Sequence, residues 1–273
     1  MGSSSDRLFS ISWVIASFLM ICGGLAMAFG AAVAAGFRTE LAAYGAFAAG
    51  ATVGGFTAGR ASPHRSFLEP AIAGALVVLV VLAFARATPI GKMAITLFSD
   101  AVTELSYRLG GIGFAAGLVG ALVGEGITRG PPPSGGLRWM WTSTLVTAGA
   151  LLVASTAAGV ILLNEAAEQV IAQFFAGELG SRPLIEEGRI AMTVAISTAA
   201  AAFLGGMVTQ MAAPRRMLLA AASGALLSVA GVVVVAGIIT GEPLDAAMPA
   251  AITGAIAGAI AWAGALLGKL ISW

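Results

Sequence analysis

Eight apolar runs, each about 20 residues long, constrain this chain more than any other feature. The hydrocarbon core of a bilayer is about 30 Å thick, and a helix of about 20 apolar residues crosses it. Only 10% of the 273 residues are charged and the mean hydropathy is +0.97, so the polar surface is too small for a water-soluble globular fold. We therefore predict an all-α, polytopic transmembrane helix bundle of about eight spans. The runs cover residues 10–35, 41–59, 67–86, 109–128, 139–163, 189–211, 217–240 and 248–271.

The charges between the runs alternate from one connection to the next. One set of connections is basic, and the other set is acidic or mixed. Basic residues concentrate on the cytoplasmic side of membrane proteins, so this alternation predicts that both termini are cytoplasmic. An odd number of spans would scramble the alternation, so the span count and the charge pattern support each other. The basic set holds Arg7, Arg60, His64, Arg65, Arg129, Arg138, Arg215, Arg216 and Lys269.

Two connections of the other set have the residue spacing of amphipathic helices. In residues 90–105, apolar residues such as Leu97 recur at helical spacing with polar residues between them. Residues 164–176 repeat this pattern, with Val170 and Phe174 on the apolar face. Both segments also carry acidic residues, which disfavour binding to anionic lipid. We predict two amphipathic, non-spanning helices on the outer face, which cap the bundle or lie on lipid.

The two halves of the chain share short motifs in the same order. The segment 54–65 matches 205–216, because each has a Gly-Gly pair followed by a proline and two basic residues. The pattern Gly-Ala-Leu-x-Gly at 120–124 recurs at 264–268. Four spans in each half would give the halves the same orientation in the membrane. We predict two tandem four-span repeats, residues 1–130 and 137–273, joined by a Pro/Gly linker at 131–136.

Pairs of glycines four residues apart occur repeatedly within the runs. Helices in lipid associate through close backbone packing, which such pairs permit. Packing between helices of one chain is the first interpretation. The dense stripes of the fourth and eighth runs also suit contact between two copies of the chain. The pairs are Gly55 and Gly59, Gly113 and Gly117, Gly120 and Gly124, Gly254 and Gly258, and Gly264 and Gly268.

Four ionisable residues gather before and at the start of the third run. Arg60, His64 and Arg65 precede Glu69, and Pro70 follows it. An acidic residue in the first turn of a helix complements the positive end of the helix dipole, which is one interpretation of Glu69. The alternative is a polar cluster at the cytoplasmic mouth, in which Glu69 binds a proton or a cation.

Opposite charges occupy matching positions near the ends of the fourth and eighth runs. Glu125 follows Gly124, and Lys269 follows Gly268. Each side chain could reach the cytoplasmic interface separately, because long charged side chains extend toward water. The alternative is an ion pair between the two repeats, formed by Glu125 and Lys269.

The apolar runs carry no ionisable residue in their central parts. Ion-coupled transporters, proton pumps and voltage sensors usually have such a residue within the membrane. The single histidine and the lack of a P-loop, a nucleophile elbow or a dinucleotide-binding fingerprint disfavour an enzyme. We therefore predict no catalytic, cofactor-binding or metal-binding residues and no cofactor. A net charge of +1 disfavours nucleic acid as a partner.

One helix end resembles a known sequence pattern. The segment Gly54-Gly55-Phe56-Thr57-Ala58-Gly59-Arg60 resembles a helix end in several families of uncharacterised bacterial multi-pass inner-membrane proteins. The second half departs from it, with Gln210-Met211 at the Gly-Arg positions. The resemblance implies a location in the bacterial cell inner membrane and no particular activity.

These features favour a non-enzymatic integral membrane protein, namely a structural or interaction subunit of a membrane complex. Its partners would be the lipid bilayer and other membrane subunits or a second copy of the chain. The alternative is a transporter or pore for a small apolar or lipid-like molecule, held between the two halves. Such a cargo requires no charge inside the membrane.

Overall fold

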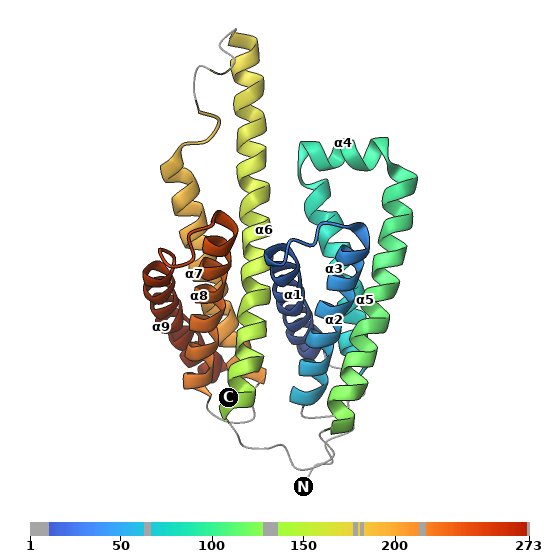
Figure 1. Cartoon of the computed structure of the whole chain (residues 1–273), viewed down its shortest axis with the longest axis vertical. Helices are drawn as coiled ribbons and strands as arrows, with labels where there is room; N and C mark the ends of the chain where they lie inside the picture. The colour runs from blue at the N-terminus through green and yellow to red at the C-terminus, as the bar shows by residue number, and fades with distance from the viewer. Residues whose placement is uncertain are drawn as a thin grey trace.

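The chain is an all-helical bundle whose long helices are suited to cross a membrane (Figure 1). The computed structural model describes residues 11–62, 67–127, 136–176, 180, 183–212 and 217–271, which contain nine helices and no strand. Eight of these helices are long and apolar enough to span a bilayer. The helices are α1 (Ile11–Ala34), α2 (Glu40–Ala61), α3 (Leu68–Arg86), α4 (Pro89–Leu97), α5 (Ser99–Ile127), α6 (Gly136–Ala176), α7 (Glu187–Ala212), α8 (Leu218–Thr240) and α9 (Ala247–Ile271).

The predicted helical bundle is confirmed in its number of candidate spans, which is eight, and in most of their bounds. The helices α1, α2, α3, α7, α8 and α9 each begin and end within two residues of the predicted runs. The helices α5 and α6 are longer than predicted, because adjoining amphipathic segments continue them. Apolar length therefore locates the spans well, whereas it does not locate the ends of helices that leave the apolar layer.

The first amphipathic segment, 90–105, is divided between two helices. The short helix α4 ends before Phe98, and α5 begins at Ser99. Thr88 caps α4, since its hydroxyl accepts a hydrogen bond from the Gly91 backbone N–H at 3.0 Å. Figure 1 shows α4 lying across the ends of α3 and α5, and none of its residues is buried.

The second amphipathic segment, 164–176, does not form a helix of its own. It is the last part of α6, which has 41 residues and is therefore about 60 Å long. No proline interrupts the helix near residue 164, and no glycine lies between 160 and 176, so the backbone has no reason to turn there. In Figure 1 the end of α6 extends well beyond its neighbours. Asn164 also donates a hydrogen bond to the Ala87 carbonyl at 3.1 Å, which links α6 to the end of α3.

The spanning helices pack as two groups of four. In the first group α1 contacts α2 and α3, and both of these contact α5. In the second group α6 contacts α7 and α8, and both of these contact α9. The contact between α1 and α6 joins the groups. We call the end of the bundle at which α1 and α6 begin the proximal end, and the opposite end, where α4 lies, the distal end (Figure 1).

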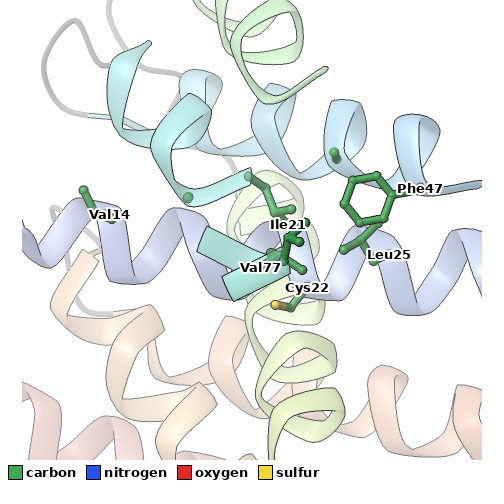
Figure 2. Packing of buried hydrophobic residues seen from close by; sticks show 9 residues of the cluster. Val14, Ile21, Cys22, Leu25, Phe47 and Val77 are labelled. Carbon is green, nitrogen blue, oxygen red and sulfur yellow. The ribbon is translucent and has the colours of Figure 1, made fainter. Parts of the chain in front are cut away.

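Each group has its own buried apolar cluster, and a third cluster lies where the groups meet. Figure 2 shows the first-group cluster, in which the Phe47 ring lies beside Leu25 and close to Ile21 and Val77. The cluster at the junction contains Trp13 of α1 and Trp139 of α6, together with Met20 and Val146. The cluster of the second group is made of four alanines, one valine and one leucine. The two groups are thus filled by side chains of different size.

Candidate functional site

A large open space lies within the second group of helices. It is an open cavity of about 970 Å³ between α6, α7, α8 and α9, with Ala26 of α1 at one edge. Its wall is almost entirely apolar, and the polar side chains in it are hydroxyls only. The lining residues include Ala148, Leu151, Leu152, Ser155, Val194, Thr198, Val229, Val232, Thr253, Ile256, Ala257 and Ile260.

The chemistry of this wall suits an apolar occupant. The Thr253 hydroxyl already donates to the Pro249 carbonyl of its own helix at 2.7 Å, so it offers little to a ligand. Cavities lined in this way bind apolar molecules rather than ordered water, because water needs several polar partners. The volume lies in the range of small-molecule sites, about 300–1,000 Å³. The cavity can therefore hold a lipid-like molecule, and hydroxyls are the polar side chains of its wall.

Two serine hydroxyls hold α8 against α6 on the proximal side of the cavity. Ser228 donates to the Thr144 carbonyl at 2.7 Å, and Ser143 donates to the Ala221 carbonyl at 3.3 Å. Hydrogen bonds between helices stabilise association in lipid, where no water competes for these groups. Sequence reasoning missed these residues. The pattern that indicates such contacts in a sequence is a serine inside an otherwise apolar run.

The predicted glycines of the first group lie against backbone of neighbouring helices. A Cβ added to any of them would collide with a carbonyl group, so only glycine permits these approaches. The close contacts join α5 to α2 and α3, and they account for the density of glycine in α5. Gly55 lies on Gly117, Gly59 on Ala121, Gly113 on Gly74, Gly120 on Thr52 and Gly124 on Phe56.

The predicted glycines of the second group contact α7 and α8. Gly264 lies on the Phe203 carbonyl, and an added Cβ at Gly268 would be 2.7 Å from the Met207 carbonyl oxygen. Gly254 and Gly258 pack less closely, since a Cβ there would be 3.0 and 3.1 Å from carbonyl oxygens of α8. The glycine stripes of α5 and α9 thus face helices of the same chain.

Two further glycines, outside the predicted set, form the junction between the groups. Gly23 of α1 lies on the Leu145 carbonyl of α6, and Gly149 of α6 lies on the Leu19 carbonyl of α1. Neither glycine has a second glycine four residues away, so the spacing pattern did not reveal them. These two positions require glycine because each lies against a backbone carbonyl of a helix that is distant in the sequence.

The polar residues predicted around the start of the third run are placed only in part. Glu69 is completely buried in the first turn of α3. Arg60 lies in the last turn of α2, with its guanidinium over the Phe56 ring at 5.9 Å. Arg138 of α6 lies near enough for the two guanidinium groups to repel each other. His64 and Arg65 lie outside the described residues. Within the described ranges, no three His, Cys, Asp or Glu side chains could hold a metal ion together.

The helices that carry Glu125 and Lys269 lie apart. Glu125 is near the end of α5, which packs on α2 and α3, whereas Lys269 is near the end of α9, which packs on α7 and α8. Figure 1 shows α5 and α9 on opposite flanks of the molecule, with α1 and α6 between them. The two residues thus lie near the ends of helices from different groups, and the ion pair between them stays a prediction.

The fold and the cavity together describe a multi-pass helical membrane protein with an apolar internal space in one of its two helix groups. No protein-family model, curated protein or solved structure matches the chain.

Proposed function

We propose that this chain is a non-enzymatic integral membrane protein that binds a small apolar or lipid-like molecule. The observation that carries the proposal is the apolar cavity of about 970 Å³ between α6, α7, α8 and α9. The sequence-based prediction was that such a molecule lies between the two halves of the chain. The proposed site instead lies within the second group.

We also propose that the two groups are tandem repeats, because the contacts at their junction are reciprocal. Gly23 lies on Leu145 and Gly149 lies on Leu19, so exchanging α1 with α6 turns one contact into the other. Under the same exchange Trp13 of α1 and Trp139 of α6 occupy matching positions, and both lie in the cluster at the junction. A pseudo-twofold axis along the bundle would produce such a self-complementary contact.

Contacts elsewhere support the same correspondence. Residues of α2 match residues of α7 at one constant shift in the sequence, and residues of α5 match residues of α9 at another. Three of the four close glycine contacts between α2 and α5 then have a counterpart between α7 and α9, whereas Gly59 on Ala121 has none, because Gln210 stands at the position that matches Gly59. Gly55 on Gly117 corresponds to Gly206 on Ala261, Gly120 on Thr52 to Gly264 on Phe203, and Gly124 on Phe56 to Gly268 on Met207.

Under this correspondence, the cavity of the second group matches a filled core in the first. Phe47 is buried in the first-group cluster (Figure 2). Its counterpart Thr198 lines the cavity. Leu109 packs against the same cluster, and its counterpart Thr253 also lines the cavity. Smaller side chains at matching places thus leave the second group hollow. The first group then supports the second, which binds the apolar molecule.

Filling the cavity with the first-group residues tests the proposal. We expect the double variant Thr198→Phe, Thr253→Leu to bind methyl oleate, a neutral single-chain probe, at least about tenfold more weakly than the wild type. One tenfold step is about 1.4 kcal/mol, less than the cost of excluding several CH₂ groups at about 0.8 kcal/mol each. Binding is measured by native mass spectrometry on protein purified in detergent.

The control is Ile196→Phe, which adds an aromatic ring on the exposed face of α7, outside the cavity wall. It should bind the probe as the wild type does. Equal binding by the double variant and the wild type, with both proteins monodisperse, would overturn the proposed site.

A second candidate function is that of an interaction subunit, for which the distal part of α6 is the supporting observation. Ile171, Phe174 and Phe175 are 58%, 63% and 82% exposed on a helix that extends past its neighbours. Apolar surface of this kind marks contact with other membrane subunits, a second copy or lipid. Native mass spectrometry of the purified protein also tests this second candidate function. A fixed additional polypeptide mass that disappears in Phe174→Asp supports this function, and a lone chain in both samples opposes it.

We further propose that the protein lies in a bacterial inner membrane with both termini cytoplasmic. A cysteine at Ser134, between α5 and α6, should then be shielded in intact cells from a membrane-impermeant thiol reagent. A cysteine at Leu244, which is 87% exposed between α8 and α9, should react. The native Cys22 is 3% exposed and gives little background. The reverse labelling pattern would contradict this orientation.

A further inference from the structure

A second pocket lies at the distal end of the first group. Its volume is about 480 Å³, and α3, α4 and α5 form its walls. The deep part is apolar, with Val78 and Leu82 of α3 facing Gly110 and Gly111 of α5. The rim is polar and includes Arg86 and Thr103. The pocket is therefore amphipathic along its length, unlike the uniformly apolar cavity of the second group.

The length of this pocket matches one leaflet of a bilayer. Along α3 it runs from Ala75 to Arg86, which corresponds to about 16 Å of helix. Half of the hydrocarbon core is about 15 Å. A single acyl chain that enters with its head at the distal end would thus extend to about the middle of the membrane.

The two glycines in the wall support an occupant, because packing within the chain does not explain them. An added Cβ at Gly110 or Gly111 would meet no atom within 4 Å. By contrast, Gly113 one turn further on lies against Gly74 of α3. Glycine inside a helix is less favourable than alanine, because its backbone loses more conformational freedom. Two adjacent glycines that face open space keep a groove free at that cost.

Arg86 supplies the rim with a positive charge. Two other arginines at the distal end form ion pairs within the chain, Arg108 with Glu104 and Arg189 with Glu165. Arg86 has no carboxylate partner among the described residues, and it lines the pocket together with hydroxyl groups. A guanidinium binds phosphate or carboxylate through two parallel hydrogen bonds, so the rim suits an anionic head group.

We propose that the α3–α4–α5 pocket binds an anionic single-chain amphiphile, or one acyl chain of an anionic lipid, with the head group at Arg86. The chain lies in the groove along Gly110 and Gly111. The short helix α4 forms the roof above the head group, and its Thr88 cap holds it across the ends of α3 and α5. This proposal is independent of the cavity between α6 and α9.

The test compares head groups of different charge on one chain length. Protein in detergent is titrated with lysophosphatidylglycerol, oleate or lysophosphatidylcholine, and bound ligand is counted by native mass spectrometry. We expect the wild type to bind at least one of the two anionic amphiphiles about 10- to 100-fold more tightly than the zwitterionic one. Preference for lysophosphatidylglycerol alone identifies a phosphate site, and preference for oleate alone identifies a carboxylate site.

The variants assign the preference to the pocket. Arg86→Gln should abolish it, because glutamine keeps the polar chain and removes the charge. Arg86 is exposed, so this change leaves the packing of the bundle intact. Gly111→Leu should weaken the binding of all three amphiphiles by filling the groove. The matched control is Lys92→Gln, which removes a nearby positive charge on α4 outside the pocket wall and should keep the preference.

Three outcomes would overturn the proposal. They are equal binding of anionic and zwitterionic amphiphiles by the wild type, a preference that survives in Arg86→Gln, and an equal loss in Lys92→Gln. The double variant Thr198→Phe, Thr253→Leu separates the two sites, since it should leave the anionic preference unchanged.

Discussion

Replacing Gly149 with leucine is expected to separate the two helix groups. A Cβ at this position would occupy the space of the Leu19 carbonyl and lie 3.0 Å from the Gly23 nitrogen. Both obstacles are backbone, so α1 and α6 must move apart along their whole crossing. Close packing is the main source of helix association in lipid, and its loss here is expected to cost at least about 3 kcal/mol. The apparent melting temperature in detergent should fall by at least about 6 °C.

The control for this prediction is on the same helix. Gly159→Leu adds the same side chain where an added Cβ would meet nothing within 4 Å, so it should leave the melting temperature nearly unchanged. Gly23→Leu should behave as Gly149→Leu does, because its Cβ would collide with the Leu145 carbonyl in the reciprocal contact. If Gly149→Leu and Gly159→Leu melt at the same temperature, the described junction between α1 and α6 is wrong.

Replacing Phe47 with alanine is expected to produce the second large effect. Phe47 is 7% exposed and belongs to the cluster that joins α1, α2 and α3, and its ring also reaches Gly113 of α5 (Figure 2). Truncation of a buried phenylalanine costs about 3–5 kcal/mol, from lost contacts and from the cavity left behind. Thermal unfolding in detergent should show this loss.

The matched variant in the other group is Thr198→Ala. Thr198 lines a space that is already open, so removing its hydroxyl and methyl groups creates no new cavity. We expect a change below about 1 kcal/mol. Similar losses in Phe47→Ala and Thr198→Ala would contradict the difference between a filled first group and a hollow second group.

Properties that depend on one helix at a time could be predicted from the sequence. A span such as α3 is recognised because nearly every side chain within about 20 residues favours lipid over water, whatever its neighbours are. The bounds of α5 and α6 were harder to predict, because polar residues at their distal ends fit equally well on a continuing helix and on a separate one. Phe98 ends one such segment, whereas Asn164 lies within an unbroken helix.

The glycine patterns also show which features could be predicted from one helix and which required the structure. A pair such as Gly120 and Gly124 indicates that some backbone approaches closely, and the structure identifies that backbone as Thr52 and Phe56 of α2. The motif could not show whether the partner belongs to the same chain. Gly23 and Gly149 carried no motif at all, yet they hold the groups together.

The amino-acid sequence decided that this protein is a bundle of membrane helices, because transfer of side chains from water to lipid is a sum over the residues of each helix. Only the tertiary structure decided which helices meet, and therefore where space remains between them. Thr198 and Phe47 both lie in apolar runs of similar composition. One lines a cavity and the other fills a core, because packing depends on the volume of side chains that distant segments bring to the same place.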